Sequence, residues 1–230
     1  MKVLGLIPAR AGSKGVPGKN RREIGGMSLV ERTFRVAQES EVLDRIVVST
    51  DDYQVLANAQ KMGLEVPFVR PVVLSGDSTP MIDVVNHALA QLDLSGYRPT
   101  AVMLLQPTSP LRTADHIRQA FGLLWGGDSV CSVVPLPLTL CPHYVMKVDD
   151  QGHLVNFLPE GAAITRRQDV PQAYVRDGTI YLTKRSVLVE KRSFYGSSCI
   201  PMVLDPSESL SIDTEEDWTL AVQRLHREAA

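Results

Sequence analysis

The sequence VLGLIPARAGSKGVPGKN, at residues 3–20, joins a short apolar run to a loop rich in glycine and basic residues. Residues 3–7 are apolar and end at a proline, so we expect a short buried strand. The loop that follows places Arg10, Lys14 and Lys19 among glycines. Glycines let backbone N–H groups approach a ligand closely, and basic side chains neutralise it. The stretch therefore indicates a site for an anion with several charges, most simply a nucleoside triphosphate.

Two common phosphate-binding motifs do not describe this loop. A Walker A loop needs glycine at position 13 and serine or threonine after the lysine, but Ser13 and Asn20 stand there. The dinucleotide fingerprint also fails, because Lys14 and Pro17 occupy positions that it reserves for glycine. The alternative interpretation is a long solvated turn whose charges serve solubility. We expect Lys14 itself to be an exposed charge.

The first 135 residues alternate apolar strands with amphipathic helices. Further strands are predicted at residues 46–48, 64–69, 101–105 and 129–134, and helices after Ser28, at 53–62, from Pro80 to about residue 92, and at 114–125. Strands that alternate with helices indicate the α/β class, with a mostly parallel sheet and helices on both of its faces. Such sheets bind ligands at the carboxyl ends of their strands.

The alternation stops between residues 135 and 172, where prolines are frequent and only short β-like pieces occur, at 143–148 and 153–157. We expect this segment to be an inserted β-rich arm that covers the site or pairs with a second subunit. Strands return at 179–183 and 199–204, and a closing helix begins near Thr214.

Composition excludes several classes of protein. The net charge of −2 argues against a nucleic-acid binder, which needs a broad basic face. The three cysteines are widely spaced and form no CxxC pattern, so a disulfide framework or zinc site is not expected. No segment resembles a signal peptide or a membrane span. We expect a soluble, cytoplasmic protein with neither nucleic acid nor membrane as a partner.

Five stretches, taken together, resemble the acylneuraminate cytidylyltransferase family, whose members make CMP-sialic acid and related CMP-sugars. The stretches are IPARAGSKGVPGKN (7–20), VVSTDD (47–52), LLQPTSPLR (104–112), RRQDVPQAY (166–174) and SIDTEEDW (211–218), and they follow the family's order. The resemblance implies transfer of CMP from CTP to an acidic nine-carbon (nonulosonic) sugar, with release of pyrophosphate. It also implies one Rossmann-like nucleotidyltransferase domain over residues 1–230, with a dimerisation or lid insertion at about 135–175, and a homodimer.

The resemblance assigns residues to the nucleotide. Arg10 and Lys19 would hold the triphosphate and stabilise the charge that develops at phosphorus. The neighbours implied to seat the nucleotide are Ala9, Ser13 and Asn20, and Arg70 with Ser78 or Thr79 would contact cytosine and ribose. Ser78 and Thr79 have an equally simple interpretation as a helix cap.

The sugar is assigned to Gln106, Arg167, Gln168 and Asp177. A guanidinium such as that of Arg167 pairs with a carboxylate through two parallel hydrogen bonds, and the resemblance directs it to the substrate of the neighbouring subunit. Asp177 stands where asparagine is frequent in the family, so the sugar that is selected stays open. Arg112 follows at the same ligand-binding edge, and two interpretations stay open for it, a ligand contact and a structural ion-pair partner.

The cofactor implied is Mg²⁺, with Asp213 as its protein ligand. Many family members carry a second aspartate two residues earlier, where this chain has Ser211. Two alternatives stay open. One is a CMP-Kdo synthetase, which uses an eight-carbon acid, and the other is a non-catalytic nucleotide-binding regulator of the same fold.

Overall fold

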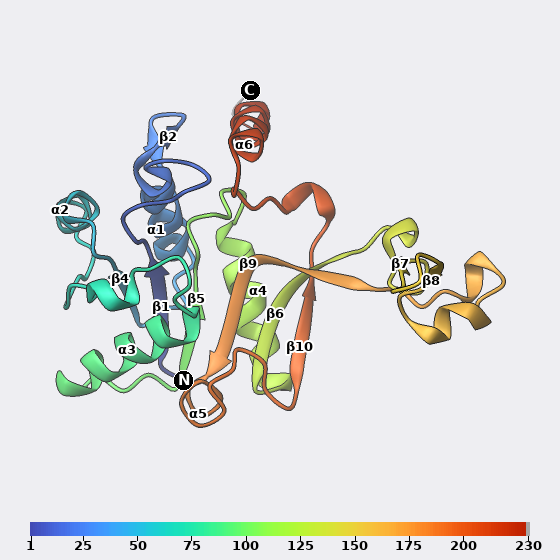
Figure 1. The fold of residues 1–230 in the computed structure, drawn as a ribbon. Helices are drawn as coiled ribbons and strands as arrows, with labels where there is room; N and C mark the ends of the chain where they lie inside the picture. Colours follow the sequence, from blue (N-terminus) through green and yellow to red (C-terminus); the bar gives the residue numbers. More distant parts are fainter. Residues whose placement is uncertain (229–230) are drawn as a thin grey trace.

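A six-stranded sheet forms the centre of the computed structural model, which describes residues 1–228 (Figure 1). Its strand order is β10-β6-β9-β5-β1-β4. The strands are β1 (Val3–Pro8), β4 (Arg45–Ser49), β5 (Ala101–Leu104), β6 (Ser129–Pro135), β9 (Tyr174–Lys184) and β10 (Cys199–Val203). All neighbouring pairs are parallel except those of β9, which runs antiparallel to both β5 and β6. The predicted mostly parallel α/β sheet is confirmed.

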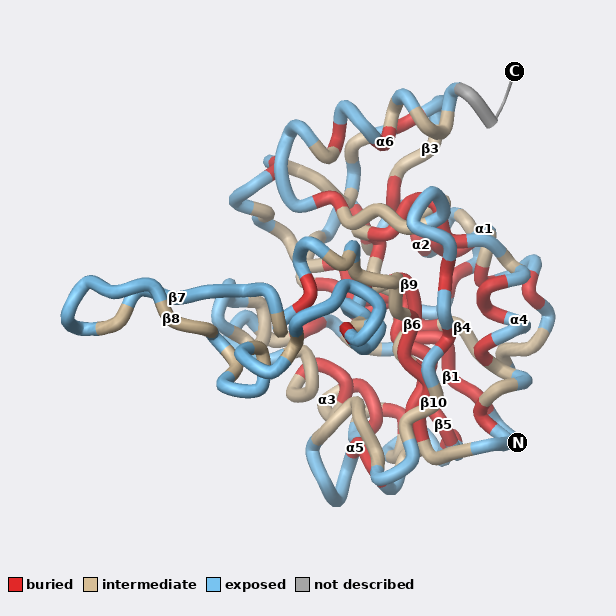
Figure 2. The backbone as a smooth tube through the Cα atoms, turned by 90° about the vertical axis from the view of Figure 1, so that its right-hand side faces the viewer, coloured by how far each residue is buried: buried red, intermediate tan, exposed pale blue. Residues whose placement is uncertain are grey.

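Helices cover both faces of this sheet. The α-helices are α1 (Leu29–Glu39), α2 (Tyr53–Lys61), α3 (Met81–Leu94), α4 (Ala114–Leu123), α5 (Arg185–Glu190) and α6 (Glu215–Glu228). Short 3-10 helices are η1 (Lys19–Arg21), η2 (Val72–Leu74), η3 (Leu124–Gly126), η4 (Leu138–Leu140), η5 (Pro159–Ala163), η6 (Arg167–Asp169) and η7 (Pro206–Glu208). Side chains of α1, α2 and α4 pack on one face, and those of α3 and α5 pack on the other. Every residue of β1 is therefore buried, and Figure 2 shows the buried strands at the centre of the molecule.

Residues 64–69 do not form the predicted strand. They make one isolated parallel bridge, between Val47 and Glu65, in which Val48 N–H donates to the Glu65 carbonyl at 3.0 Å. Pro67 follows shortly after and has no N–H to donate, so the pairing does not continue. The sheet consequently ends at β4.

The inserted segment leaves the sheet between β6 and β9 and projects away from it as an arm (Figures 1 and 2). Its two β-like pieces form an antiparallel hairpin of β7 (Met146–Val148) and β8 (Leu154–Asn156). A second small hairpin, β2 (Glu23–Ile24) with β3 (Met27–Ser28), precedes α1. Within residues 1–228, none of the helices combines the length and the apolar character needed to span a membrane.

Candidate functional site

The carboxyl ends of β1, β4 and β5 meet at one edge of the sheet, on the side of α6 (Figure 1). The segments that follow these strands are hydrogen-bonded to one another. Thr50 Oγ1 donates to the Ala9 carbonyl at 2.5 Å, and the Ala11 N–H donates to Asp51 Oδ1 at 2.8 Å. The Ile212 N–H donates to the Thr108 carbonyl at 2.8 Å, which adds the segment before α6. Distant parts of the sequence are thereby fixed around one cavity.

The cavity has a volume of about 190 Å³ and is open to solvent on one side. It is lined by Pro8, Arg10, Ser13, Lys19, Asn20, Arg70, Met81, Gln106, Pro107 and Thr108. Six of these residues were assigned to nucleotide or sugar from the sequence. Three are cations, and none of the lining residues described is acidic. A concave site with this charge suits a polyanion.

The opening loop is fixed against the segment that precedes α6. Val16 is fully buried in a small apolar cluster with Ile212 and Trp218. A Cβ added to Gly15 would lie only 2.0 Å from the Asp213 carbonyl oxygen, so only glycine fits at this approach. Burial of a valine side chain contributes about 1.5–3 kcal/mol. The loop therefore has one anchored side and one side that faces the cavity.

Arg10 and Lys19 of this loop are held by two different segments of the chain. Lys19 Nζ donates to the Ile212 carbonyl at 2.5 Å and lies 3.4 Å from Asp213 Oδ1. Arg10 Nη2 donates to Asp77 Oδ1 at 2.5 Å, while Asn20 Nδ2 donates to the Arg10 carbonyl at 3.0 Å. Both cations consequently line the cavity and are held by groups from distant parts of the chain.

Arg70 is the buried cation of the site, with 3% of its surface exposed. Its Nε donates to Ser49 Oγ at 3.0 Å and its Nη2 to the Ser49 carbonyl at 2.5 Å. Burial lowers the pKa of Arg70 to about 10, while the negative charge of Asp51 opposes this shift and the positive charge of Arg10 adds to it. The group is still a cation at neutral pH.

Asp213 lies beside Lys19, which lines the cavity, and 71% of the Asp213 side chain is exposed. Its Oδ2 accepts a hydrogen bond from Ser211 Oγ at 3.1 Å. Among residues 1–228, no group of three or more His, Cys, Asp or Glu side chains is arranged to hold a metal. An exposed carboxylate beside a polyanion site is a donor set that fits Mg²⁺ when phosphate oxygens and waters supply the other ligands.

Gln106 faces the kink of β9 at Asp177 and Gly178. A Cβ added to Gly178, whose φ is +81°, would lie 3.8 Å from Gln106 Oε1. Asp177 is 9% exposed, and its carboxylate accepts hydrogen bonds from the N–H and the hydroxyl of Thr179. The fold thus brings two of the residues assigned to the sugar together.

Arg112 joins these two segments. Its Nε donates to the Thr179 carbonyl and its Nη2 to the Gln106 carbonyl, both at 2.7 Å. Burial lowers the pKa of Arg112 to about 9, and the charge of Asp177 opposes the shift. Arg112 therefore has a structural role through backbone carbonyls, but the expected ion pair is not found among the salt bridges of residues 1–228, and Asp177 acts on Arg112 only through its charge.

Seven assigned residues do not line the cavity: Ala9, Ser78, Thr79, Arg167, Gln168, Asp177 and Asp213. Ser78 and Thr79 lie on the exposed segment before α3, whose cap position is taken by Pro80 without a side-chain hydrogen bond. The helix-cap interpretation is therefore wrong. Arg167 and Gln168 lie in η6 of the arm, where both are exposed.

Sequence reasoning missed Asp51, Asp77, Met81 and Thr108. Asp51 and Thr108 follow directly on strands that end at the binding edge, so their position was a usable signal. Asp77 and Met81 lie in the chain that follows residues 64–69. This part of the chain turns back over the opening loop, and no periodic pattern in the sequence predicts that turn.

Comparison with known proteins gives a consistent result. The sequence profile of the cytidylyltransferase family matches residues 4–201. The chain is 37% identical to CMP-N,N'-diacetyllegionaminic acid synthase of Legionella pneumophila over 234 aligned residues, which cover 100% of this chain and 99% of the relative. It is 31% identical to the protein of that name from Campylobacter jejuni, over 95% of this chain and 93% of the relative.

A solved structure gives the same fold at lower identity. CMP:2-keto-3-deoxy-manno-octonic acid synthetase complexed with CTP superposes with a TM-score of 0.74 and 16% identity, covering 99% of this chain and 100% of that one.

Proposed function

The chain belongs to the cytidylyltransferase family, and on that premise we propose that it joins CTP to a nonulosonic acid, giving a CMP-sugar and pyrophosphate. The observation that carries this proposal is the cavity at the sheet edge, in which Arg10, Lys19 and Arg70 meet. Curated relatives whose names describe CMP-N,N'-diacetyllegionaminic acid synthases support the acceptor class.

Arg10 and Lys19 are proposed to bind the triphosphate and to stabilise the transition state. The anomeric hydroxyl gives up its proton to solvent as its oxygen attacks the innermost phosphorus of CTP, the bond from that phosphorus to the bridging oxygen breaks, and pyrophosphate leaves with the negative charge. Fixed cations stabilise the charge of both the phosphoryl group and the leaving group. Because Lys19 is held by the Ile212 carbonyl, little reorganisation is needed when the nucleotide binds.

Ser13, Asn20 and Arg70 are proposed to seat the nucleoside, and Gln106 the sugar. Ala9 is proposed to act through its position, since its N–H and carbonyl are bonded to Ser49 and Thr50. Asp177 sits beside Gln106 with its carboxylate turned toward Thr179. We therefore propose that Asp177 acts on sugar selection through the shape of the β9 kink. Ser78 and Thr79, which lie between Asp77 and the cavity residue Met81, are proposed to contact cytosine and ribose.

Asp213 is proposed as the protein ligand of Mg²⁺, which when bound supplies further positive charge to the phosphates. Ser211 orients the Asp213 carboxylate through the hydrogen bond to Oδ2. The exposure of the Asp213 carboxylate and its distance of 3.4 Å from Lys19 Nζ support this assignment.

The arm is proposed to join two chains into a homodimer. Large apolar side chains are exposed on it, which suits an interface between protein subunits. They include Tyr144, Met146, Val148, Leu154 and Phe157. Arg167 and Gln168, which lie on the same arm, would then approach the sugar of the partner. We place the reaction in the cytoplasm, where CTP is available.

The test is pyrophosphate release from CTP in the presence of Mg²⁺ and a panel of acids. Release that requires CTP together with a nine-carbon nonulosonic acid supports the proposal. Release only with the eight-carbon acid Kdo would identify the alternative acceptor. Binding of CTP without turnover on any acid of the panel would contradict the proposed reaction.

A further inference from the structure

The carboxylate of Asp77 pairs with two cations of the opening loop. Its Oδ1 lies 2.5 Å from Arg10 Nη2, and its Oδ2 lies 2.6 Å from Lys14 Nζ. Arg10 also reaches the Ser75 carbonyl, at 3.5 Å through Nη1. The segment of residues 75–77 is thus fastened across the opening loop, and Asp77 occupies hydrogen-bond donors of a cation that lines the cavity.

A phosphate group and the Asp77 carboxylate would use the same donors. The guanidinium of Arg10 forms charge-assisted hydrogen bonds with either anion. The two oxygens of a carboxylate resemble two oxygens of a phosphate group in charge and spacing. We propose that Asp77 is an intramolecular competitor for the pyrophosphate half of CTP. It occupies Arg10 and Lys14 in the nucleotide-free enzyme and gives them up when CTP enters, an inference that rests on the proposed function.

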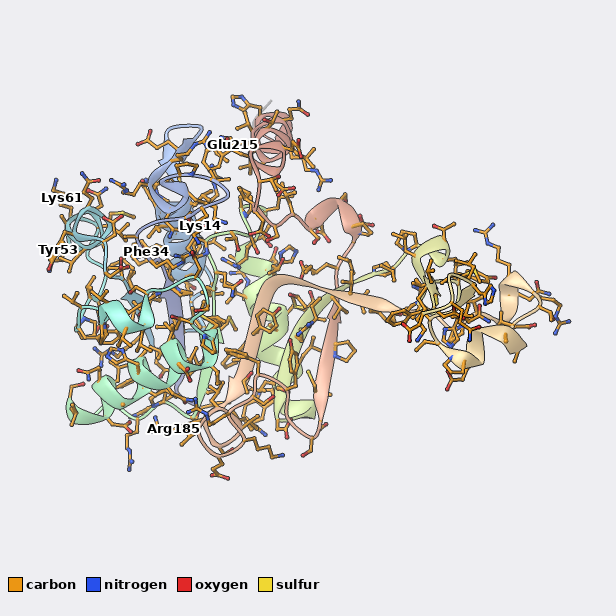
Figure 3. The ribbon with its side chains drawn as sticks, in the orientation of Figure 1. Lys14, Phe34, Tyr53, Lys61, Arg185 and Glu215 are labelled. Carbon is orange, nitrogen blue, oxygen red and sulfur yellow. The ribbon has the colours of Figure 1, made fainter. Side chains whose placement is uncertain are left out.

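The segment of residues 72–77, which carries Asp77, can move at a small cost in free energy. Val72 and Val73 on η2 are 85% and 81% exposed, and Asp77 retains 40% exposure of its side chain. Segments with few buried apolar contacts open at a small fraction of the global unfolding free energy. Lys14 is also exposed, with 83% of its side chain accessible, and Figure 3 labels it toward the α6 end of the sheet. Asp77 can therefore withdraw without disturbing the sheet.

Two consequences follow for the reaction. CTP brings enough negative charge to displace Asp77, whereas CMP, with one phosphate, leaves the Asp77 pairs in place. After transfer, the returning carboxylate lowers the affinity for pyrophosphate and speeds its release. Asp77 would thus favour the triphosphate as substrate and weaken inhibition by the product.

The experiment is calorimetric titration of the full-length enzyme with pyrophosphate and with CMP, each in the presence of Mg²⁺. The variant is Asp77→Asn, which removes the charge but keeps the size. The matched control is Asp83→Asn. Asp83 lies on the neighbouring helix α3, and its carboxylate is paired with Arg192, so the substitution removes an equal charge. Thermal unfolding of each variant checks that the fold is retained.

We expect Asp77→Asn to bind pyrophosphate about three- to tenfold more tightly than wild type, since two exposed ion pairs no longer compete. CMP affinity is expected to change by less than about twofold, and Asp83→Asn to match wild type for both ligands. Unchanged or weaker pyrophosphate binding by Asp77→Asn would overturn the inference, and weaker binding would show that Asp77 orients Arg10. Equal tightening by Asp83→Asn would also overturn it, because net charge would then be the cause.

A CTP titration and a CTP turnover assay of the wild type, run beside these measurements, separate this inference from the proposed function. If wild type binds CTP and turns it over while Asp77→Asn binds pyrophosphate as wild type does, only the competitor role fails. If wild type binds neither CTP nor pyrophosphate, the proposed function fails and the competitor role with it.

Discussion

The ammonium group of Lys19 lies 3.4 Å from a carboxylate oxygen of Asp213, although 194 positions of sequence separate the two residues. The same ammonium donates to the Ile212 carbonyl at 2.5 Å, and only 11% of the Lys19 side chain is exposed. A cation that lines the cavity therefore lies within ion-pair distance of the proposed metal ligand. Their proximity depends on how the opening loop packs against the segment before α6.

Replacement of Lys19 by methionine is expected to lower kcat/KM for CTP by about 10²–10³-fold, the usual cost of removing one fixed transition-state donor. The fold should be retained, because methionine keeps the apolar stem. Lys61→Met, at an exposed position of α2, is the control and should stay within about twofold of wild type. Steady-state kinetics measures kcat/KM and thermal unfolding checks the fold. Similar losses of kcat/KM in the two variants would contradict a specific role for Lys19.

Substitution of Asp213 by asparagine is expected to raise the Mg²⁺ concentration for half-maximal rate by about tenfold or more, because asparagine is a neutral and weaker ligand for a hard cation. The control is Glu216→Gln, an exposed acid on the first turn of α6. Initial rates are measured across a Mg²⁺ titration. Full activity of the Asp213 variant at low Mg²⁺ would rule out its role as metal ligand.

Gly15→Ala is expected to cost about 1–3 kcal/mol of stability, because the new methyl group overlaps the Asp213 carbonyl and the loop must shift. The same shift should weaken CTP binding. Gly122→Ala in α4 is the matched control, since nothing lies within 4 Å of the added methyl group and alanine favours a helix. Denaturant unfolding and CTP titration of both variants test this. Equal free energies of unfolding for the Gly15→Ala and Gly122→Ala variants would show that the close approach at Gly15 does not affect stability.

The dimer proposed for the arm predicts that Leu154→Asp dissociates it, because a charge would be buried at an apolar interface. Leu154 is 65% exposed in the single chain. The control is Leu94→Asp at the end of α3, where the leucine is 83% exposed. Sedimentation of both variants should give a monomer for Leu154→Asp and the wild-type mass for Leu94→Asp. A monomeric wild type would contradict the dimer directly.

The stability of α6 should depend on pH through Asp217. The backbone N–H of Asp213 and that of Thr214 both donate to this carboxylate and lower its pKa. A carboxyl group with a lowered folded pKa stabilises the protein above its unfolded value of about 3.9 and loses that effect as the pH falls through the folded value.

Asp217→Asn should therefore lower Tm by about 1–3 °C at neutral pH, with the difference shrinking below about pH 3.9. Scanning calorimetry of wild type and variant across this range measures it. A constant difference at all pH values would mean that the charge of Asp217 has no part in holding the helix.

Local patterns in the sequence predicted most of the sheet. The apolar run at β1 and the glycine-rich loop after it placed Arg10 and Lys19 at the edge where the cavity lies, because parallel strands end together. The opposite direction of β9 left no such signal, since a strand buried on both faces has the same composition whichever way it runs. The missing strand at residues 64–69 reflects the lack of an N–H at Pro67.

The contacts that complete the site were beyond sequence reasoning. Asp77 meets Arg10 across 67 positions, and Gly15 meets Asp213 through the path of the loop. Neither pairing follows from periodicity or composition, because both depend on how two loops cross. The resemblance to a known family supplied Gln106 and Asp213, whose roles no local pattern would have given.

The most direct test of the account is a crystal structure of the protein with CTP bound. We predict the triphosphate in the cavity, with Arg10 and Lys19 at about 2.7–2.9 Å from phosphate oxygens. A nucleotide bound elsewhere on the surface, with both side chains making no contact to it, would contradict the account.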